Sequence, residues 1–98
     1  MTTKRTTRPE EVVRELTIVN KLGLHQRPAA AFVRIASKFE AEVVVEKDGE
    51  EVNGKSILGM LTLAASCGET IKITTRGRDA DEAMKALEEL VASKFGEE

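Results

Sequence analysis

Two stretches of the chain alternate between hydrophobic and polar residues, and this alternation predicts β-strands. They are VVRELTIV, residues 12–19, and ETIKITT, residues 69–75. In an extended strand every second side chain lies on the same face. The residues predicted to share a face are Leu16 and Ile18 in the first strand and Ile71 and Ile73 in the second. Each strand is therefore expected to bury one face and expose the other.

A β-hairpin is predicted for AEVVVEKDGEEVNG, residues 41–54. Val43 and Val45 fall on one face of its first strand. Asp48 and Gly49 form the strongest two-residue hairpin signal in the chain. A strand is therefore expected on each side of this turn.

Helical spacing of apolar residues occurs in RPAAAFVRIASKFE, residues 27–40. The recurring apolar positions are Ala29, Phe32, Val33, Ala36 and Phe39. Pro28 suits the first helical turn, because an N–H there would have no partner within the helix. Arg27 precedes this proline and is therefore disfavoured from helical backbone angles. A helix is predicted to begin at about Arg27.

Two further helices are predicted after the hairpin. Ser56 is a good candidate N-cap for a short helix that runs to about Ala65. Asp79 and Glu82 have the spacing of a capping box at the start of the last helix. The apolar face of that helix comprises Ala83, Leu87, Leu90 and Val91. Gly96 is predicted to end it.

The predicted order of elements is β-α-β-β-α-β-α, which fits one α+β domain over residues 12–98. Hairpins and strands with one apolar face favour an antiparallel or mixed sheet with helices on one side, a two-layer sandwich. Residues 1–11 are polar and mixed in charge, and a poorly ordered tail is expected there.

Composition narrows the class of protein. The 98 residues carry a net charge of −2, whereas a nucleic-acid-binding domain would be clearly basic. The chain has no apolar run that could span a membrane, and its first residues lack the apolar core of a secretion signal. The single cysteine, Cys67, cannot form an internal disulfide, which favours the cytoplasm. A metal site is not expected, because the single histidine has no second histidine to complete one. No cofactor is expected either.

The segment GEEVNGKS, residues 49–56, matches the P-loop pattern G-x-x-x-x-G-K-[ST] of nucleotide-binding proteins. Here Gly49 is assigned to the hairpin turn, and the next three residues to its return strand. A P-loop domain also needs a parallel sheet with both faces covered. The segment is therefore not interpreted as a nucleotide site, and an NTPase remains only a distant alternative.

The only histidine, His25, lies in GLHQRPAA, between a glycine turn and a predicted helix start. Helix N termini present unpaired N–H groups that bind anions, here expected to belong to Ala29, Ala30 and Ala31. Arg27 adds a planar guanidinium suited to phosphate oxygens. The residues alone leave two interpretations open: an anion-binding or phosphoryl-accepting site, or a histidine that is merely a structural or a surface residue.

Two motifs, GLHQRPAA and NGKSILGMLTLAA, resemble the HPr family of histidine phosphocarriers from the bacterial phosphoenolpyruvate-dependent phosphotransferase system. The resemblance covers about residues 13–95. It implies a four-stranded antiparallel sheet under three helices, in an open-faced sandwich. It also implies that His25 accepts a phosphoryl group from enzyme I on its pros nitrogen and passes it to EIIA domains, while Arg27 steadies the phosphate. Ser56 matches a regulatory serine that HPr kinase/phosphorylase modifies in many members.

The resemblance further implies a monomeric carrier protein, not an enzyme, with a docking surface for its partners. The expected docking residues are Gln26, Ile57, Leu58 and Leu61. Ile57 and Leu61 are predicted to be exposed, because the short helix has more apolar residues than one buried face can use. Gln26 stands where alanine or threonine is more usual in the family, and the N-terminal tail is longer than is typical. Two alternatives within the fold remain: a nitrogen-regulatory NPr-type carrier, and a regulatory docking module without phosphate relay.

Overall fold

The computed structural model describes residues 10–97, so most of the predicted polar tail (residues 1–9) lies outside the described residues, as does Glu98. The elements in chain order are β1 (Glu11–Thr17), α1 (Gln26–Ala36), β2 (Glu42–Lys47), β3 (Glu50–Asn53), α2 (Ile57–Leu63), β4 (Thr70–Arg76), α3 (Ala80–Ala92) and a short 3₁₀ turn, η2 (Lys94–Gly96). The predicted order β-α-β-β-α-β-α is therefore confirmed.

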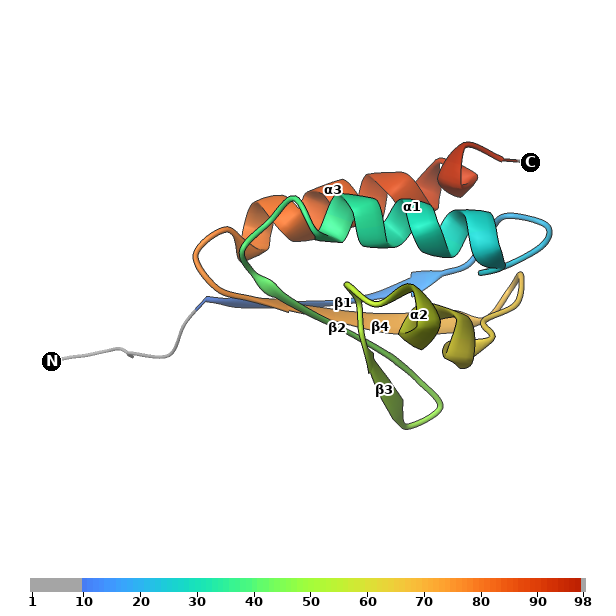
Figure 1. The fold of residues 1–98 in the computed structure, drawn as a ribbon, viewed down its shortest axis with the longest axis horizontal. Coiled ribbons are helices and arrows are strands. Elements are labelled where there is room, and N and C mark those ends of the chain that lie inside the picture. Colours follow the sequence, from blue (N-terminus) through green and yellow to red (C-terminus); the bar gives the residue numbers. More distant parts are fainter. Residues whose placement is uncertain (1–9, 98) are drawn as a thin grey trace, which may run out of the picture.

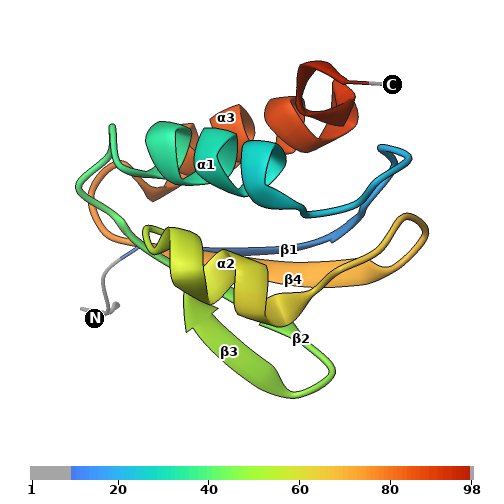
Figure 2. The same ribbon diagram turned by 45° about the vertical axis from the view of Figure 1, so that its right-hand side comes forward.

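The four strands form one antiparallel sheet in the order β1-β4-β2-β3. All three helices lie on the same side of it, with α1 and α3 side by side and α2 next to the β2–β3 hairpin (Figures 1 and 2). The predicted α+β open-faced sandwich is confirmed. Of the two sheet types left open by the pattern, antiparallel is the one observed.

The core lies between the sheet and the helices. The predicted inward pairs of β2 and β4 are buried in full: Val43, Val45, Ile71 and Ile73 are each at most 1% exposed. Phe32 of α1, Met60 of α2 and Leu87 of α3 meet them from above, each 0% exposed. Burial of apolar side chains, at about 1.5–3 kcal/mol each, therefore joins all three helices to one face of the sheet.

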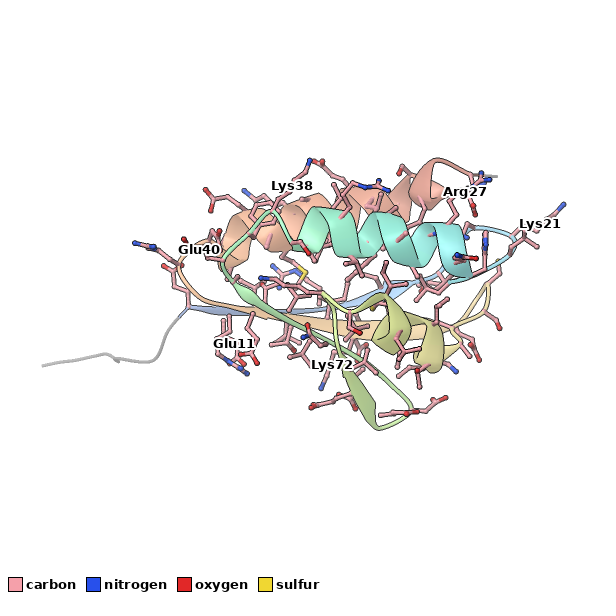
Figure 3. The ribbon with its side chains drawn as sticks, in the orientation of Figure 1. Glu11, Lys21, Arg27, Lys38, Glu40 and Lys72 are labelled. Atoms are coloured by element: carbon pink, nitrogen blue, oxygen red, sulfur yellow. The ribbon has the colours of Figure 1, made fainter. Side chains whose placement is uncertain are left out.

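The opposite face of the sheet is polar and carries rows of opposite charge across the strands. Arg76 of β4 donates to Glu11 of β1 and to Glu42 of β2, both at 2.8 Å. These carboxylates raise the pKa of Arg76 above its ordinary value, first through the Glu11 hydrogen bond. Two rows further along, Lys72 lies 3.2 Å from Glu46. Figure 3 shows Glu11 and Lys72 below the sheet, away from α1 and α3. Charged pairs therefore occupy two rows of this face, and Val13, 43% exposed, lies in the row between them.

The capping box predicted at the start of α3 is wrong. Asp79 occupies the N-cap position, but its side chain makes no capping hydrogen bond. Its carboxylate instead accepts from the backbone N–H groups of Glu40, at 2.9 Å, and Ala41, at 2.8 Å. The pKa of Asp79 is lowered by these bonds, that of Glu40 first. Asp79 therefore fixes the α1–β2 connection rather than the helix that follows it.

Two predicted helix ends also differ from the structure. The first helix ends at Ala36, so Phe39 lies in the following turn and is only half-buried. The last helix ends at Ala92, and Gly96 belongs to the separate turn η2. Apolar residues, Phe39 and Phe95, follow both helix ends at helical spacing. A prediction from periodicity alone therefore makes both helices too long.

The segment GEEVNGKS does not form a phosphate-binding loop. Asp48 and Gly49 adopt positive φ angles of 53° and 83° in the hairpin turn, as the hairpin prediction required. The amine of Lys55 donates to the backbone oxygen of Phe39 at 2.7 Å. Ser56 caps α2 as predicted, since its hydroxyl oxygen accepts from the Gly59 N–H at 3.0 Å. The glycine turn, the lysine and the serine of the motif are thus all used within the antiparallel fold, as a hairpin turn, a backbone contact and a helix cap.

Gly54 is a glycine because of packing. A Cβ at this position would lie 2.5 Å from Cγ1 of Val43 and 3.2 Å from Cε1 of Phe32. Gly54→Ala is therefore expected to lower the free energy of unfolding by about 1–3 kcal/mol, the usual cost of overpacking a core. Urea denaturation of the variant beside the parent measures this directly. A variant as stable as the parent would contradict the close contact.

Within residues 10–97, no helix is long and apolar enough to cross a membrane. The same residues contain no group of three or more histidine, cysteine or acidic side chains arranged to hold a metal ion.

Candidate functional site

His25 lies in the loop between β1 and α1, and this loop is tied to the segment that follows α2. Leu24 N–H donates to the backbone oxygen of Ala65 at 2.8 Å. Gly23 has a φ of +72°, and a Cβ there would lie only 2.6 Å from that same oxygen. Glycine is therefore required at this position, both for its left-handed conformation and for the close approach of the two backbones.

His25 is also the N-cap residue of α1, with extended backbone angles, and its side chain makes no capping bond. Its carbonyl accepts from Ala29 N–H at 3.0 Å. Ala30 and Ala31 lie further inside the helix, where each N–H faces the carbonyl four residues earlier, so the expectation that these three alanines are open donors is wrong. The helix begins at Gln26, one residue before the predicted start. The free donors are accordingly the N–H groups of Gln26 and Arg27, because Pro28 has none.

The imidazole ring of His25 is held by an acidic residue from the far end of the chain. Nε2 lies 3.0 Å from Oε2 of Glu97 and 3.2 Å from Oε1. An ionised carboxylate only accepts hydrogen bonds, so Nε2 must carry the proton in this contact. In the neutral ring the other nitrogen, Nδ1, then holds the lone pair. Glu97 was not among the residues predicted for the site.

Glu97 is ionised more readily than an ordinary glutamate. Partial burial on its own would raise its pKa, yet the pKa lies below the ordinary value. Hydrogen bonds from His25 and Asn20, together with the charge of Arg27, outweigh the effect of burial. The carboxylate is therefore an acceptor-only group at any pH above the ordinary glutamate range.

Arg27 and Gln26 are exposed beside the histidine. With His25 and Ala30 they line an open hollow of about 410 Å³ on the surface. Within the described part of the chain, Arg27 forms no ion pair closer than 4.0 Å. Figure 3 shows Arg27 and Lys21 at the same end of the molecule. A guanidinium with free donors next to an open imidazole can receive an anion without breaking an existing bond.

The predicted docking residues on α2 lie on the surface. Ile57 is 44% exposed, Leu58 76% and Leu61 36%, and we refer to these three as the α2 patch. The predicted exposure of Ile57 and Leu61 is confirmed, and Leu58 is the most open of the three. Met60 and Leu63 form the buried side of the same helix. The end of α2 at Leu63 is close to the His25 loop, because Ala65 accepts the hydrogen bond from Leu24.

Comparisons with known proteins agree with this arrangement. A family model described as "PTS HPr component phosphorylation site" matches residues 12–93. The phosphocarrier protein HPr of Neisseria meningitidis serogroup B is 49% identical over 82 residues, which cover 84% of this chain and 92% of that protein. The HPr-like protein Crh of Halalkalibacterium halodurans is 47% identical over 76 residues, or 78% of this chain and 90% of that protein.

Among solved structures, HPr-C-His from Thermoanaerobacter tengcongensis has a TM-score of 0.83 and 52% identity, covering 91% of this chain and 98% of that one. The fold and these matches define the class as small phosphocarrier proteins. Within that class, the chain belongs to the HPr family.

Proposed function

We propose that this protein relays phosphate in the cytoplasm: His25 accepts a phosphoryl group from phosphorylated enzyme I and passes it to EIIA domains during sugar uptake. The observation that carries the proposal is the state of the His25 ring. Its Nε2 is paired with a carboxylate 3.0 Å away, which leaves the lone pair at Nδ1 as the nucleophile. Membership of the HPr family supports the same role.

In the proposed transfer, the Nδ1 lone pair forms a bond to phosphorus while the phosphorus–nitrogen bond of the donor phosphohistidine breaks. The donor ring keeps the bonding electron pair. The N–H groups of Gln26 and Arg27 and the Arg27 guanidinium are suited to receive the phosphate oxygens, because they have no other partners among the described residues. The carrier itself turns over no small molecule.

The proposal is tested by incubating the protein with phosphoenolpyruvate and enzyme I, followed by intact-mass measurement. A gain of one phosphoryl group is expected, and it should disappear when either phosphoenolpyruvate or enzyme I is omitted. Because a phosphorus–nitrogen bond is labile to acid, brief acid treatment should restore the original mass. A protein that stays unmodified under these conditions would refute the relay.

A second candidate is a regulatory docking module of the same fold that carries no phosphate between partners. A relative with a regulatory description favours it: Crh, described as the Bacillus subtilis catabolite repression HPr, is 41% identical to this chain with a TM-score of 0.61. An NPr-type nitrogen-regulatory carrier is the corresponding alternative within the relay class. The mass measurement separates the docking module from both carriers, and transfer onward to purified EIIA domains of the two branches separates the carriers from each other.

The α2 patch and Gln26 are proposed to dock enzyme I and the other partners. Leu58→Ala removes a side chain that is 76% exposed, so its effect on the free energy of unfolding should stay within about 0.5 kcal/mol. Binding to enzyme I, measured by calorimetry, should weaken by about tenfold, as for a contact near the centre of an interface.

Ile57→Ala and Leu61→Ala should weaken the same binding. The matched control is Val13→Ala, which truncates a residue 43% exposed on the opposite face of the sheet. That variant should bind enzyme I like the parent. Loss of stability with unchanged enzyme I binding in the α2 variants would assign these residues to the core instead.

Regulatory phosphorylation of Ser56 by an HPr kinase/phosphorylase is part of the proposal. The hydroxyl of Ser56 is half-buried and engaged as a helix cap at 3.0 Å from Gly59 N. A phosphate oxygen can accept the same N–H, so modification is compatible with the fold.

A further inference from the structure

The turn η2 places Glu97 against the histidine by means of an unusual backbone. Three successive residues, Lys94, Phe95 and Gly96, have positive φ angles of 60°, 56° and 77°. Only glycine adopts such angles without strain, and strained backbone persists where surrounding contacts hold it. Phe95 supplies such a contact, because its side chain is only 7% exposed and belongs to the main core. The core thus fixes the turn that carries Glu97.

A second anchor holds the Glu97 side chain from within the protein. Asn20 is fully buried, and its Nδ2 donates to Glu97 Oε1 at 3.1 Å. The same nitrogen donates to the backbone oxygen of Gly23 at 2.8 Å, in the loop that carries His25. One buried amide therefore links the histidine loop to the carboxylate that binds the histidine ring.

The Asn20 amide is costly to bury. Its Oδ1 has no hydrogen-bond partner among the described residues, and an unpaired buried acceptor destabilises a fold. The two hydrogen bonds donated by Nδ2 offset that cost, and both go to residues of the His25 site. This arrangement is typical of residues that orient a reactive imidazole through the nitrogen that does not react.

From this geometry we propose that Glu97, held by Asn20, is a positioning residue for phosphoryl transfer. It fixes the tautomer of His25 with the proton on Nε2 and orients Nδ1 toward the phosphoryl donor. The inference rests on the proposed relay for its kinetic part only, because the tautomer can be measured in the unmodified protein.

The proton balance of the step gives Glu97 a second effect. When Nδ1 bonds to phosphorus, the proton remains on Nε2, and the His25 ring gains a positive charge. The donor ring, protonated on its other nitrogen, keeps the bonding electron pair and leaves as a neutral imidazole, so the positive charge passes from the donor ring to His25. The carboxylate of Glu97, 3.0 Å from Nε2, then faces the charge that develops during transfer.

The tautomer is tested by ¹⁵N NMR of the histidine ring, which is unambiguous because the chain has one histidine. In the unmodified parent, with the ring neutral, Nε2 should show the shift of a protonated nitrogen and Nδ1 that of an unprotonated one. In Glu97→Ala the two shifts should move toward each other as both tautomers become populated. In Glu97→Gln the two shifts should also move toward each other, because an amide can donate to Nε2 as well as accept from it and so permits both tautomers.

The rate of phosphate uptake from enzyme I should fall by about tenfold in Glu97→Ala, through kcat rather than KM. The matched control is Glu89→Gln, which removes an exposed acidic group on α3; its ring shifts and rate should equal those of the parent. Unchanged ring shifts in both Glu97 variants would overturn the positioning role. If the parent itself takes up no phosphate, the relay fails while the ring shifts still decide the role of Glu97 in holding the tautomer.

Discussion

Replacing His25 by alanine is expected to abolish acid-labile phosphate uptake from phosphoenolpyruvate and enzyme I. The chain has no other histidine, so no second imidazole can take over the phosphoryl group. Loss of the nucleophile of a covalent intermediate removes the reaction itself rather than slowing it. The measurement is intact mass before and after brief acid treatment, carried out on the variant and the parent in parallel.

The loss in His25→Ala should not come from unfolding. The His25 side chain is 37% exposed and makes no capping bond, so urea denaturation should give a midpoint close to that of the parent. Ser56→Ala serves as the control, because it should still gain a phosphate that acid removes. Acid-labile phosphate in the His25→Ala protein would contradict the assignment of the acceptor.

Ser56→Asp is expected to fold normally and to take up phosphate at His25 at least tenfold more slowly than the parent. The added carboxylate would lie at the first turn of α2, next to Ile57 in the α2 patch. A charge that a partner must bury in the interface weakens docking. A phosphate carries close to two negative charges, so it should weaken docking more than aspartate does.

Direct repulsion at His25 should contribute little to this effect. The seven residues of α2 span about 10 Å, and the His25 loop is attached beyond the opposite end of that helix. That length is about one Debye length at physiological ionic strength, so the exposed charge is largely screened there. Steady-state kinetics with enzyme I should therefore show a raised KM with kcat little changed.

Ser56→Ala tests the capping role separately. It should lower the free energy of unfolding by about 1 kcal/mol, the usual cost of losing an N-cap side chain, while carrying phosphate nearly as fast as the parent. Transfer by Ser56→Asp at the parent's rate would leave Ser56 as a helix cap with no regulatory effect on docking.

Periodicity predicted most of the fold because the elements are governed by local patterns. The alternation in β2 and β4 identified Val43, Val45, Ile71 and Ile73, and these are the residues found in the core. The cap at Ser56 was predictable for the same reason, since its partner Gly59 lies three residues away. Contacts of this kind depend only on residues that are close in the sequence.

Contacts between distant segments were not predictable in this way. Asp79 has the spacing of a capping residue, but the backbone donors that it accepts from are 38 and 39 residues away. Glu97 is 72 residues from His25, and it reaches the ring only through a left-handed turn formed partly by non-glycine residues. No local propensity favours that turn; the burial of Phe95 holds it. The histidine proposed to accept phosphate was therefore visible in the sequence, whereas the glutamate that contacts its ring was not.

The strand order β1-β4-β2-β3 has a consequence for how the chain acquires its structure. Among the strands of residues 10–97, β1 pairs with β4 alone, and the two residues joined at its start, Glu11 and Arg76, are 65 positions apart. During synthesis β1 emerges long before β4, so the β2–β3 hairpin can form early, whereas β1 cannot pair until β4 has been made. Closing so long a loop makes this the slow, non-local step of folding. On a ribosome, the sheet becomes complete only after Arg76 has left the exit tunnel.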